Sequence, residues 1–220
     1  MLLDANSIAR LCVRPISPNF DIDCEQVPIG MCPREFQRAG CFGAKGDFAV
    51  TVEAARSGSR SLKCTEQPGL AKSFYPYLIY HMRGKTITQG KVTFSFALMN
   101  SAQTPAQIAV EIRDYANQGT REFLTGPLVT LDEDGQVRAG DKALARVPNG
   151  QWSQIAIMFE LGGKAAKTYT VAVTGPDGRS ATATVPFRDG TFAAATWLSI
   201  ISAGTKTAAF FLDDLKFSVE

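Results

Sequence analysis

Apolar side chains recur at every second position in several short segments of this chain. In segment 91–99 the recurring residues are Val92, Phe94, Phe96 and Leu98, with polar or small residues between them. Successive side chains of a β-strand point to opposite faces of a sheet, so this alternation predicts a strand with one buried face. Segments 108–113 and 155–160 show the same period. Several strands are therefore expected to share one core.

Short turn sequences separate the alternating segments. Four of them contain a glycine that tolerates the positive φ of tight turns: 117–119, 132–135, 148–150 and 176–178. From Phe48 onward, strand and turn signals recur at intervals of roughly 8 to 12 residues, which is typical of sandwiches and barrels. We therefore predict an all-β fold, a jelly-roll β-sandwich of two antiparallel sheets with about 11 to 13 strands and no long helix.

The N-terminal segment differs from the rest of the chain. A short helix is expected at 5–11, and Pro15 and Pro18 follow it. We interpret residues 1–19 as an arm or linker and residues 20–220 as the sandwich domain. A chain of 220 residues buries roughly 70% of the surface that its unfolded form exposes, so one core suffices to stabilise it.

Charge and hydropathy argue against nucleic-acid binding and against a membrane-spanning helix. The 23 basic and 21 acidic residues leave a net charge of +2, and neither sign forms a block typical of nucleic-acid-binding proteins. No nucleic-acid partner is predicted, although a polyanionic partner stays open. The longest apolar runs are far shorter than the ~20 residues that a membrane-spanning helix needs. No membrane span is expected.

The cysteine count allows several arrangements. Cys12, Cys24, Cys32, Cys41 and Cys64 form at most two disulfides and leave at least one thiol unpaired. Cys32 and Cys41 bracket a short loop and could form a disulfide. The alternative is that they are unconnected thiols. Their spacing matches no zinc pattern, and a single histidine makes a mixed site improbable.

Three short motifs resemble one group of known proteins. The segment 23–30 reads DCEQVPIG, the segment 57–63 reads SGSRSLK, and the segment 212–215 reads LDDL. In this order and spacing they resemble the strands and turns of bacterial secreted jelly-roll domains of the carbohydrate-binding-module type, which belong with concanavalin-like and galactose-binding-like sandwiches. Cys24 stands where those domains usually have an aromatic residue. The resemblance implies a secreted or cell-surface protein whose leader lies outside this sequence, and the alternative is a cytosolic protein.

The resemblance also implies a structural calcium ion. In such domains the first and last strands lie side by side and commonly hold Ca²⁺, which places the ion near Glu25 and Asp213 of this chain. Asp213 shares strand parity with Leu215 and Phe217, so its carboxylate is expected on the core side, where it needs a partner. Calcium takes ~6 to 8 oxygen ligands. The alternatives are hydrogen bonds to turn amides or a pair with Arg60, and exposure of Asp213 at the end of the sheet.

Candidate ligand-binding residues follow from the same resemblance. Modules of this class hold sugars with aromatic rings and a few polar side chains. Trp152 is out of phase with the apolar residues of its strand and is the first candidate. Glu111, Arg113 and Tyr115 share the polar side of another segment, and Tyr77 lies in the densest aromatic stretch, 74–81.

Each of these candidates has a structural alternative. Trp152 is also consistent with a plug beneath a loop, and the polar row with a solvated sheet face. His81, the only histidine, is interpreted as structural, and Trp197 as a core residue.

Catalytic signatures are weak. The chain has one histidine and no Gly-x-Ser-x-Gly elbow, which argues against serine hydrolases. It also has no Glu-x-Asp-x-x-Glu run of the kind seen in sandwich glycosidases. We therefore predict a noncatalytic module that binds a polysaccharide or oligosaccharide in a secreted or cell-surface glycan-degrading system. The module is either part of a larger chain with other domains or is secreted beside a glycan-degrading enzyme. The alternatives are a structural or protein-interaction sandwich and, second, a polysaccharide lyase or glycoside hydrolase.

Overall fold

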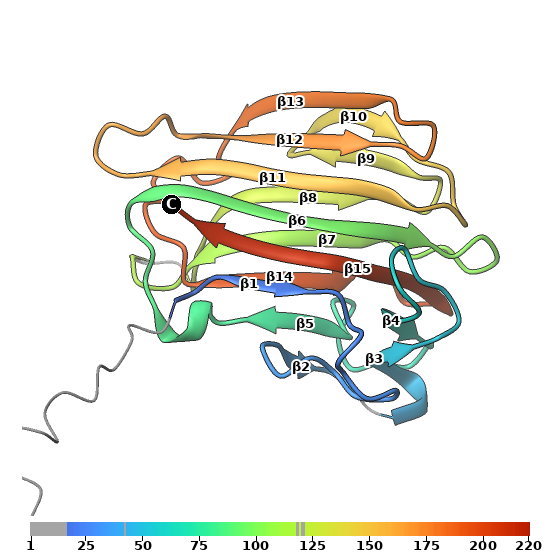
Figure 1. Ribbon diagram of the computed structural model, residues 1–220. Coiled ribbons are helices and arrows are strands. Elements are labelled where there is room, and N and C mark those ends of the chain that lie inside the picture. The colour runs from blue at the N-terminus through green and yellow to red at the C-terminus, as the bar shows by residue number, and fades with distance from the viewer. Residues whose placement is uncertain (1–16, 42, 118, 120–121) are drawn as a thin grey trace, which may run out of the picture.

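The alternating segments pair into two antiparallel sheets that pack face to face. A computed structural model describes residues 17–41, 43–117, 119 and 122–220, and Figure 1 shows the sheets as two layers. The expected helix at 5–11 and Cys12 lie outside the described residues. The first strand begins at Phe20. The predicted sandwich of antiparallel sheets is confirmed.

The first sheet has eight strands. Its order is β13-β12-β11-β6-β15-β4-β3, and β1 pairs with one end of β15. The strands are β1 (Phe20–Ile22), β3 (Gly46–Thr51), β4 (Ser61–Glu66), β6 (Gly90–Asn100), β11 (Ser153–Leu161), β12 (Thr168–Thr174), β13 (Ser180–Pro186) and β15 (Ala208–Val219).

The second sheet has seven strands, in the order β10-β9-β8-β7-β14-β5-β2. The strands are β2 (Gln37–Ala39), β5 (Tyr77–Tyr80), β7 (Ile108–Asp114), β8 (Leu124–Leu131), β9 (Gln136–Ala139), β10 (Lys142–Arg146) and β14 (Trp197–Ser202). Two 3-10 helices complete the elements, η1 (Gly43–Lys45) and η2 (Met82–Gly84). Within the described part of the chain, no helix has the length and apolar character needed to cross a membrane.

The fifteen described strands exceed the predicted number. β1 and β2 have only three residues each, which is too short for an alternating pattern to be recognised. β10 has no buried residue, so its composition does not differ from that of a loop. These strands form through pairing with longer neighbours rather than through a pattern of their own.

The core lies between the two sheets. The alternating residues of β6 are all at most 2% exposed, as predicted: Val92, Phe94, Phe96 and Leu98. Phe20, Tyr80 and Phe217 pack around Phe94 with ring centroids 4.9 to 6.5 Å apart. Burial of each such side chain contributes roughly 1.5 to 3 kcal/mol to stability. This packing holds both sheets as rigid platforms.

A β-bulge in β15 reverses which side chains face the core. The register of β15 against β6 shifts between Asp213 and Lys216, and Asp214 has a φ of 49°. Leu212 faces the core before the bulge, and Leu215 does so after it. Asp213 therefore lies on the outer side of the sheet, opposite Ala97. The prediction that Asp213 faces the core was wrong because one extra residue interrupts the period of two.

The cysteines of the described segments are not bridged. Cys24, Cys32, Cys41 and Cys64 are free thiols. The structure therefore matches the alternative in which Cys32 and Cys41 are unconnected. Burial raises the pKa of Cys32 to about 12 and that of Cys41 to about 11. Both thiols are protonated near neutral pH and are weak nucleophiles.

Candidate functional site

Six aromatic side chains form a continuous series on the outer face of the seven-stranded sheet. We call this series the aromatic row, and its members are, in order, Phe74, Tyr75, Tyr77, Trp197, Tyr115 and Phe123. Neighbouring ring centroids along the row lie 5.1 to 6.4 Å apart. The row begins before β5, crosses β5 and β14, and ends beyond β7. Phe74 is exposed and the other five side chains are half-buried, so the row is partly open to solvent.

Strand register explains why these side chains share one face. Trp197 of β14 lies directly opposite Arg113 of β7, and Ser199 lies opposite Glu111. Directly opposed residues of an antiparallel pair point to the same side of the sheet. Tyr77 joins this face because β5 pairs with the other edge of β14. The strand order β7-β14-β5 therefore brings residues from three distant parts of the sequence together.

Trp197 is not a core residue, contrary to the sequence-based prediction. The side chains of Leu198 and Ile200 fill the core, and Trp197, one residue before Leu198, points to the opposite face. There it is half-buried and contacts three rings: Tyr77, Tyr115 and His81. Trp197 is thus the centre of the aromatic row. The signal for this position was its phase relative to Leu198.

A polar network lies beside Trp197. The guanidinium of Arg113 donates from Nε to Oε2 of Glu111 at 2.6 Å and from Nη1 to the Tyr115 hydroxyl at 3.2 Å. The Phe123 ring covers the same guanidinium, with Cζ 3.9 Å from the ring centroid. Burial lowers the pKa of Arg113, but Glu111 and Tyr115 outweigh it and the net shift is upward. Arg113 is therefore a fixed cation whose charge is largely neutralised.

A pocket of about 350 Å³ opens next to the row. Its lining consists of His81, Gly84, Lys85, Thr86, Tyr115, Thr196 and Trp197. Thr196 positions Tyr115 by accepting a hydrogen bond from its backbone N–H at 3.0 Å. The described residues that line the pocket include one lysine and no carboxylate. The row and the pocket share Tyr115 and Trp197, so they form one surface.

His81 is held in a defined orientation at the edge of the pocket. Its Nε2 lies 2.8 Å from Oε1 of Gln37. Its ring packs edge-to-face with the Trp197 ring, and the two ring centroids are 4.4 Å apart. A carboxamide oxygen only accepts hydrogen bonds, so Nε2 carries a hydrogen. Burial lowers the pKa of His81 below its usual value, and the ring is neutral at pH 7. The only histidine thus belongs to the candidate surface as well as to the packing around it.

Trp152 does not join the other predicted ligand residues. It lies just before β11, in the eight-stranded sheet, where it is half-buried. Glu111, Arg113, Tyr115 and Tyr77 all belong to the seven-stranded sheet or its connections. The structure therefore brings four of the five predicted residues together and places the fifth in the opposite layer.

Glu25 binds the turn that follows β3. Its Oε1 accepts hydrogen bonds from the backbone N–H groups of Ser59 at 2.9 Å and Arg60 at 2.8 Å, and its Oε2 accepts one from the Ser59 hydroxyl at 3.0 Å. The backbone hydrogen bonds from Ser59 and Arg60 lower the pKa of Glu25. The Arg60 guanidinium donates to the Val27 carbonyl at 2.8 Å. Glu25 is thus an acceptor for backbone amides.

Asp213 binds the other end of the same turn. Its Oδ2 accepts from the N–H groups of Arg56 at 2.8 Å and Ser57 at 3.2 Å, and its Oδ1 accepts from the N–H of Asp214 at 2.8 Å. Burial raises the pKa of Asp213, and these amide hydrogen bonds oppose that effect. Asp213 is fully buried because the turn covers it.

The surroundings of these two carboxylates fit the amide alternative better than a calcium cage. Calcium needs converging oxygen ligands, whereas Glu25 and Asp213 both face N–H donors. In the described segments, no group of three or more histidine, cysteine or acidic side chains is placed to hold a metal. The calcium ion stays an implication of the family resemblance, which a titration can test.

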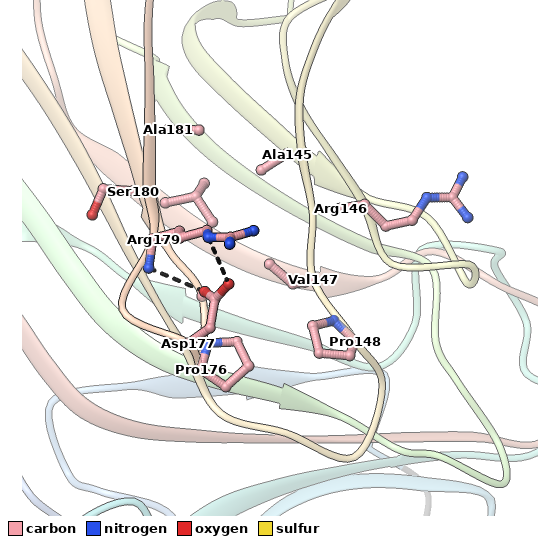
Figure 2. A pocket seen from close by; sticks show the side chains of 11 residues that line it. Ala145, Arg146, Val147, Pro148, Pro176, Asp177, Arg179, Ser180 and Ala181 are labelled. Atoms are coloured by element: carbon pink, nitrogen blue, oxygen red, sulfur yellow. Dashed lines mark hydrogen bonds and ion pairs between the residues drawn. The ribbon is translucent and has the colours of Figure 1, made fainter.

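A second hollow lies at a distant edge of the sandwich. Figure 2 shows its lining from β10 and from the turn between β12 and β13, with Asp177 paired to Arg179. The hollow has a volume of about 430 Å³, and its described lining residues include no aromatic ring. The charged pair is mostly exposed, at 55% for Asp177 and 91% for Arg179. This hollow therefore lacks the combination of rings and fixed polar groups found around Trp197.

Comparisons with known proteins give structural matches alone. No model of a known protein family matches the chain, and no curated protein sequence matches it. An endo-β-1,4-glucuronan lyase from the fungus Trichoderma reesei superposes with a TM-score of 0.59 at 11% identity, covering 91% of this chain and 95% of the lyase. A carbohydrate esterase from the Shiga toxin-encoding bacteriophage phi24B gives 0.56 at 18% identity, with 84% and 90% covered.

A plant lectin is also similar. The lectin from Bauhinia forficata, solved in complex with GalNAc, gives a TM-score of 0.52 at 10% identity, with 92% of this chain and 97% of the lectin covered. Identities this low establish a common architecture and no common activity. The chain therefore has a β-sandwich fold similar to those of a lyase, an esterase and a lectin.

Proposed function

We propose that the protein binds a carbohydrate chain along the aromatic row without cleaving it. The observation that carries this proposal is the row itself, six neighbouring rings on one outer sheet face with a polar network beside them. Soluble proteins rarely expose a contiguous apolar patch without a binding role. Aromatic faces pack against the C–H faces of sugar rings, and polar side chains next to them accept and donate to sugar hydroxyls.

Two further observations support the proposal. The three structural neighbours named above are, by their names, proteins that bind or act on carbohydrates. The arrangement also favours binding over catalysis, because Arg113, Glu111 and Tyr115 are already engaged with one another. Acid–base catalysis requires titratable groups that are free to exchange protons with a substrate.

The proposal includes a setting for the domain. A noncatalytic module of this kind acts in a secreted or cell-surface glycan-degrading system, as part of a larger chain that carries other domains. Tethering to a polysaccharide raises the local concentration of an attached enzyme without any new contact to the reacting bond.

The chain offers a matched pair of variants for the test. Trp197→Ala removes the centre of the row, and Trp152→Ala removes the other tryptophan, which lies in the opposite sheet. A glycan array identifies the polysaccharide, and calorimetry measures the affinity of each variant after circular dichroism has shown that it is folded. We expect Trp197→Ala to weaken binding by about fivefold or more, since loss of one stacked ring costs roughly 1 kcal/mol or more, and Trp152→Ala to leave it unchanged.

Other outcomes would change the conclusion. Loss of binding only in Trp152→Ala would move the site to the eight-stranded sheet. A blank array with folded wild-type protein would favour a structural or protein-interaction sandwich. New reducing ends or unsaturated products after incubation with the bound glycan would show catalysis and contradict the noncatalytic assignment.

A further inference from the structure

We propose that the glycan is acidic and that Lys85 binds one of its carboxylate groups in the pocket beside Trp197. This inference rests on the proposed function, because it assigns the ligand class of the same surface. It concerns a residue that neither the sequence motifs nor the aromatic row singles out.

Lys85 is a cation placed at the pocket by its backbone. It follows η2, and its backbone N–H donates to the Met82 carbonyl at 3.0 Å. Its side chain is exposed and forms no ion pair with the described residues. The described lining of the pocket contains no carboxylate. An anionic group that enters the pocket therefore meets a positive charge without a competing negative one.

The neighbouring cations are already neutralised. Arg113 is paired with Glu111, both side chains are 16% exposed, and the Phe123 ring covers the guanidinium. Arg83 lies 3.9 Å from Glu35. Among the described residues that line the pocket, Lys85 thus carries a charge that is available to a ligand.

The position of Lys85 couples charge recognition to stacking. Trp197 and Tyr115 belong both to the row and to the pocket lining. A sugar that stacks on Trp197 would project a ring substituent toward the pocket. Thr86, which is also exposed in the lining, supplies a hydroxyl that can donate to a carboxylate oxygen.

The test uses pairs of glycans that differ only in charge. β-1,4-Glucan and β-1,4-mannan oligosaccharides are each compared with their C6-oxidised forms, in which the primary alcohol is a carboxylate. We expect the wild-type protein to bind at least one oxidised form about fivefold more tightly than its neutral parent at low salt, as for an exposed ion pair, and to lose this preference in high salt.

Variants separate this inference from the proposed function. Lys85→Ala is expected to bind the oxidised form no more tightly than the neutral form, and Lys85→Arg to retain the preference. Lys164→Ala, an exposed lysine between β11 and β12 of the other sheet, is the matched control and should behave as wild type. Trp197→Ala should weaken both forms equally.

Three results would overturn the inference. Equal affinity for neutral and oxidised forms removes the charge preference but leaves the proposed function standing. A preference that survives in Lys85→Ala, or that disappears equally in Lys164→Ala, places the charge recognition elsewhere. If the folded protein binds neither a glycan on the array nor any of these oligosaccharides, the proposed function fails and this inference fails with it.

Discussion

Ser199 carries a buried hydroxyl group in the centre of the seven-stranded sheet. It lies on β14 beneath the candidate surface, is fully buried, and its Oγ has no partner among the described residues. The Trp197 Nε1 on the same strand face is in the same situation. Burial of an unpaired polar group costs roughly 1 to 3 kcal/mol. These two unpaired polar groups therefore lower the stability of the fold at the centre of the candidate surface.

Substitution of Ser199 tests this cost directly. Ser199→Ala removes an unpaired hydroxyl, so we expect the free energy of unfolding to stay within about 0.5 kcal/mol of wild type or to rise. Ser61→Ala is the matched control, because the equally buried Ser61 Oγ donates to the Ala54 carbonyl at 2.6 Å. Its loss should cost about 1 kcal/mol or more. Urea unfolding measures both, and a larger loss for Ser199→Ala would indicate an undescribed partner for Ser199.

At the scale of elements, the bulge of β15 joins the last strand to the turn after β3. At the bulge, Asp213 accepts hydrogen bonds from three backbone N–H groups. We expect Asp213→Asn to lower the free energy of unfolding by about 2 kcal/mol or more, because Asn has a single acceptor oxygen and its amide nitrogen cannot accept the hydrogen bonds that the other carboxylate oxygen accepts. Asp21→Asn on neighbouring β1 loses only an exposed pair with Lys216 and should cost less than about 1 kcal/mol. Urea unfolding gives both values, and equal effects would mean that the amide contacts contribute little.

The same turn allows a calcium measurement. With amide donors already facing Glu25 and Asp213, we expect the thermal midpoint to be the same in excess calcium and in chelator. A ligand that binds the folded state raises the midpoint. A rise with calcium would therefore support the ion that the family resemblance implies, and would require the turn to present carbonyl groups in place of amides.

Long strands with one buried face were predictable from the sequence, and their irregularities were not. β7 and β11 follow the period of two throughout, and β6 departs from it at Ala97, which is also buried. In β15 the residues on both sides of the bulge are apolar, so the sequence shows no break at Asp213 and parity carried across it gives the wrong face. The sequence pattern therefore predicts which segments alternate between buried and exposed residues. The position of the bulge, where the alternation changes phase, is determined by the pairing of β15 with β6.

At the scale of the whole molecule, Glu66 connects the two sheets. It lies on the inner side of β4, is 1% exposed, and accepts a hydrogen bond from the Ser202 hydroxyl of β14. Burial raises the pKa of Glu66 above its usual value of 4.5. The folded state thus binds the proton more tightly than the unfolded state does. The stabilising contribution of protonated Glu66 is complete below pH 4.5, and it is lost as the pH rises through the pKa that Glu66 has in the folded state.

Glu66→Gln removes this titration. We expect the wild-type free energy of unfolding to fall relative to that of Glu66→Gln as pH rises from 4.5 to 8, because only the wild type must bury a charge. Urea unfolding of both proteins across this range gives the difference directly. Glu53→Gln, an exposed glutamate paired with Lys63, serves as control, and parallel curves for wild type and Glu66→Gln would contradict the prediction.

Assembly of the candidate surface depends on strand order, which no local pattern reveals. Alternation placed Glu111 and Arg113 on the polar side of their strand, as the structure has them. It could not show that β14 inserts between β7 and β5, and so it gave no reason to group Trp197 or Lys85 with Glu111 and Arg113. It favoured Trp152, which has a similar phase in β11 but belongs to the other layer.

The row runs obliquely over the sheet. Tyr77, Trp197 and Tyr115 come from three strands that are neighbours in the sheet or from the residue that follows one of them. Tyr77 lies opposite Ile201, four positions along β14 from Trp197, and yet the two ring centroids are 6.4 Å apart. The spacing of the rings is therefore set by the direction in which the side chains lean as well as by the sheet. A polymer that contacts all three rings must cross the strands at an angle, whereas a polymer that lies along one strand meets a single ring.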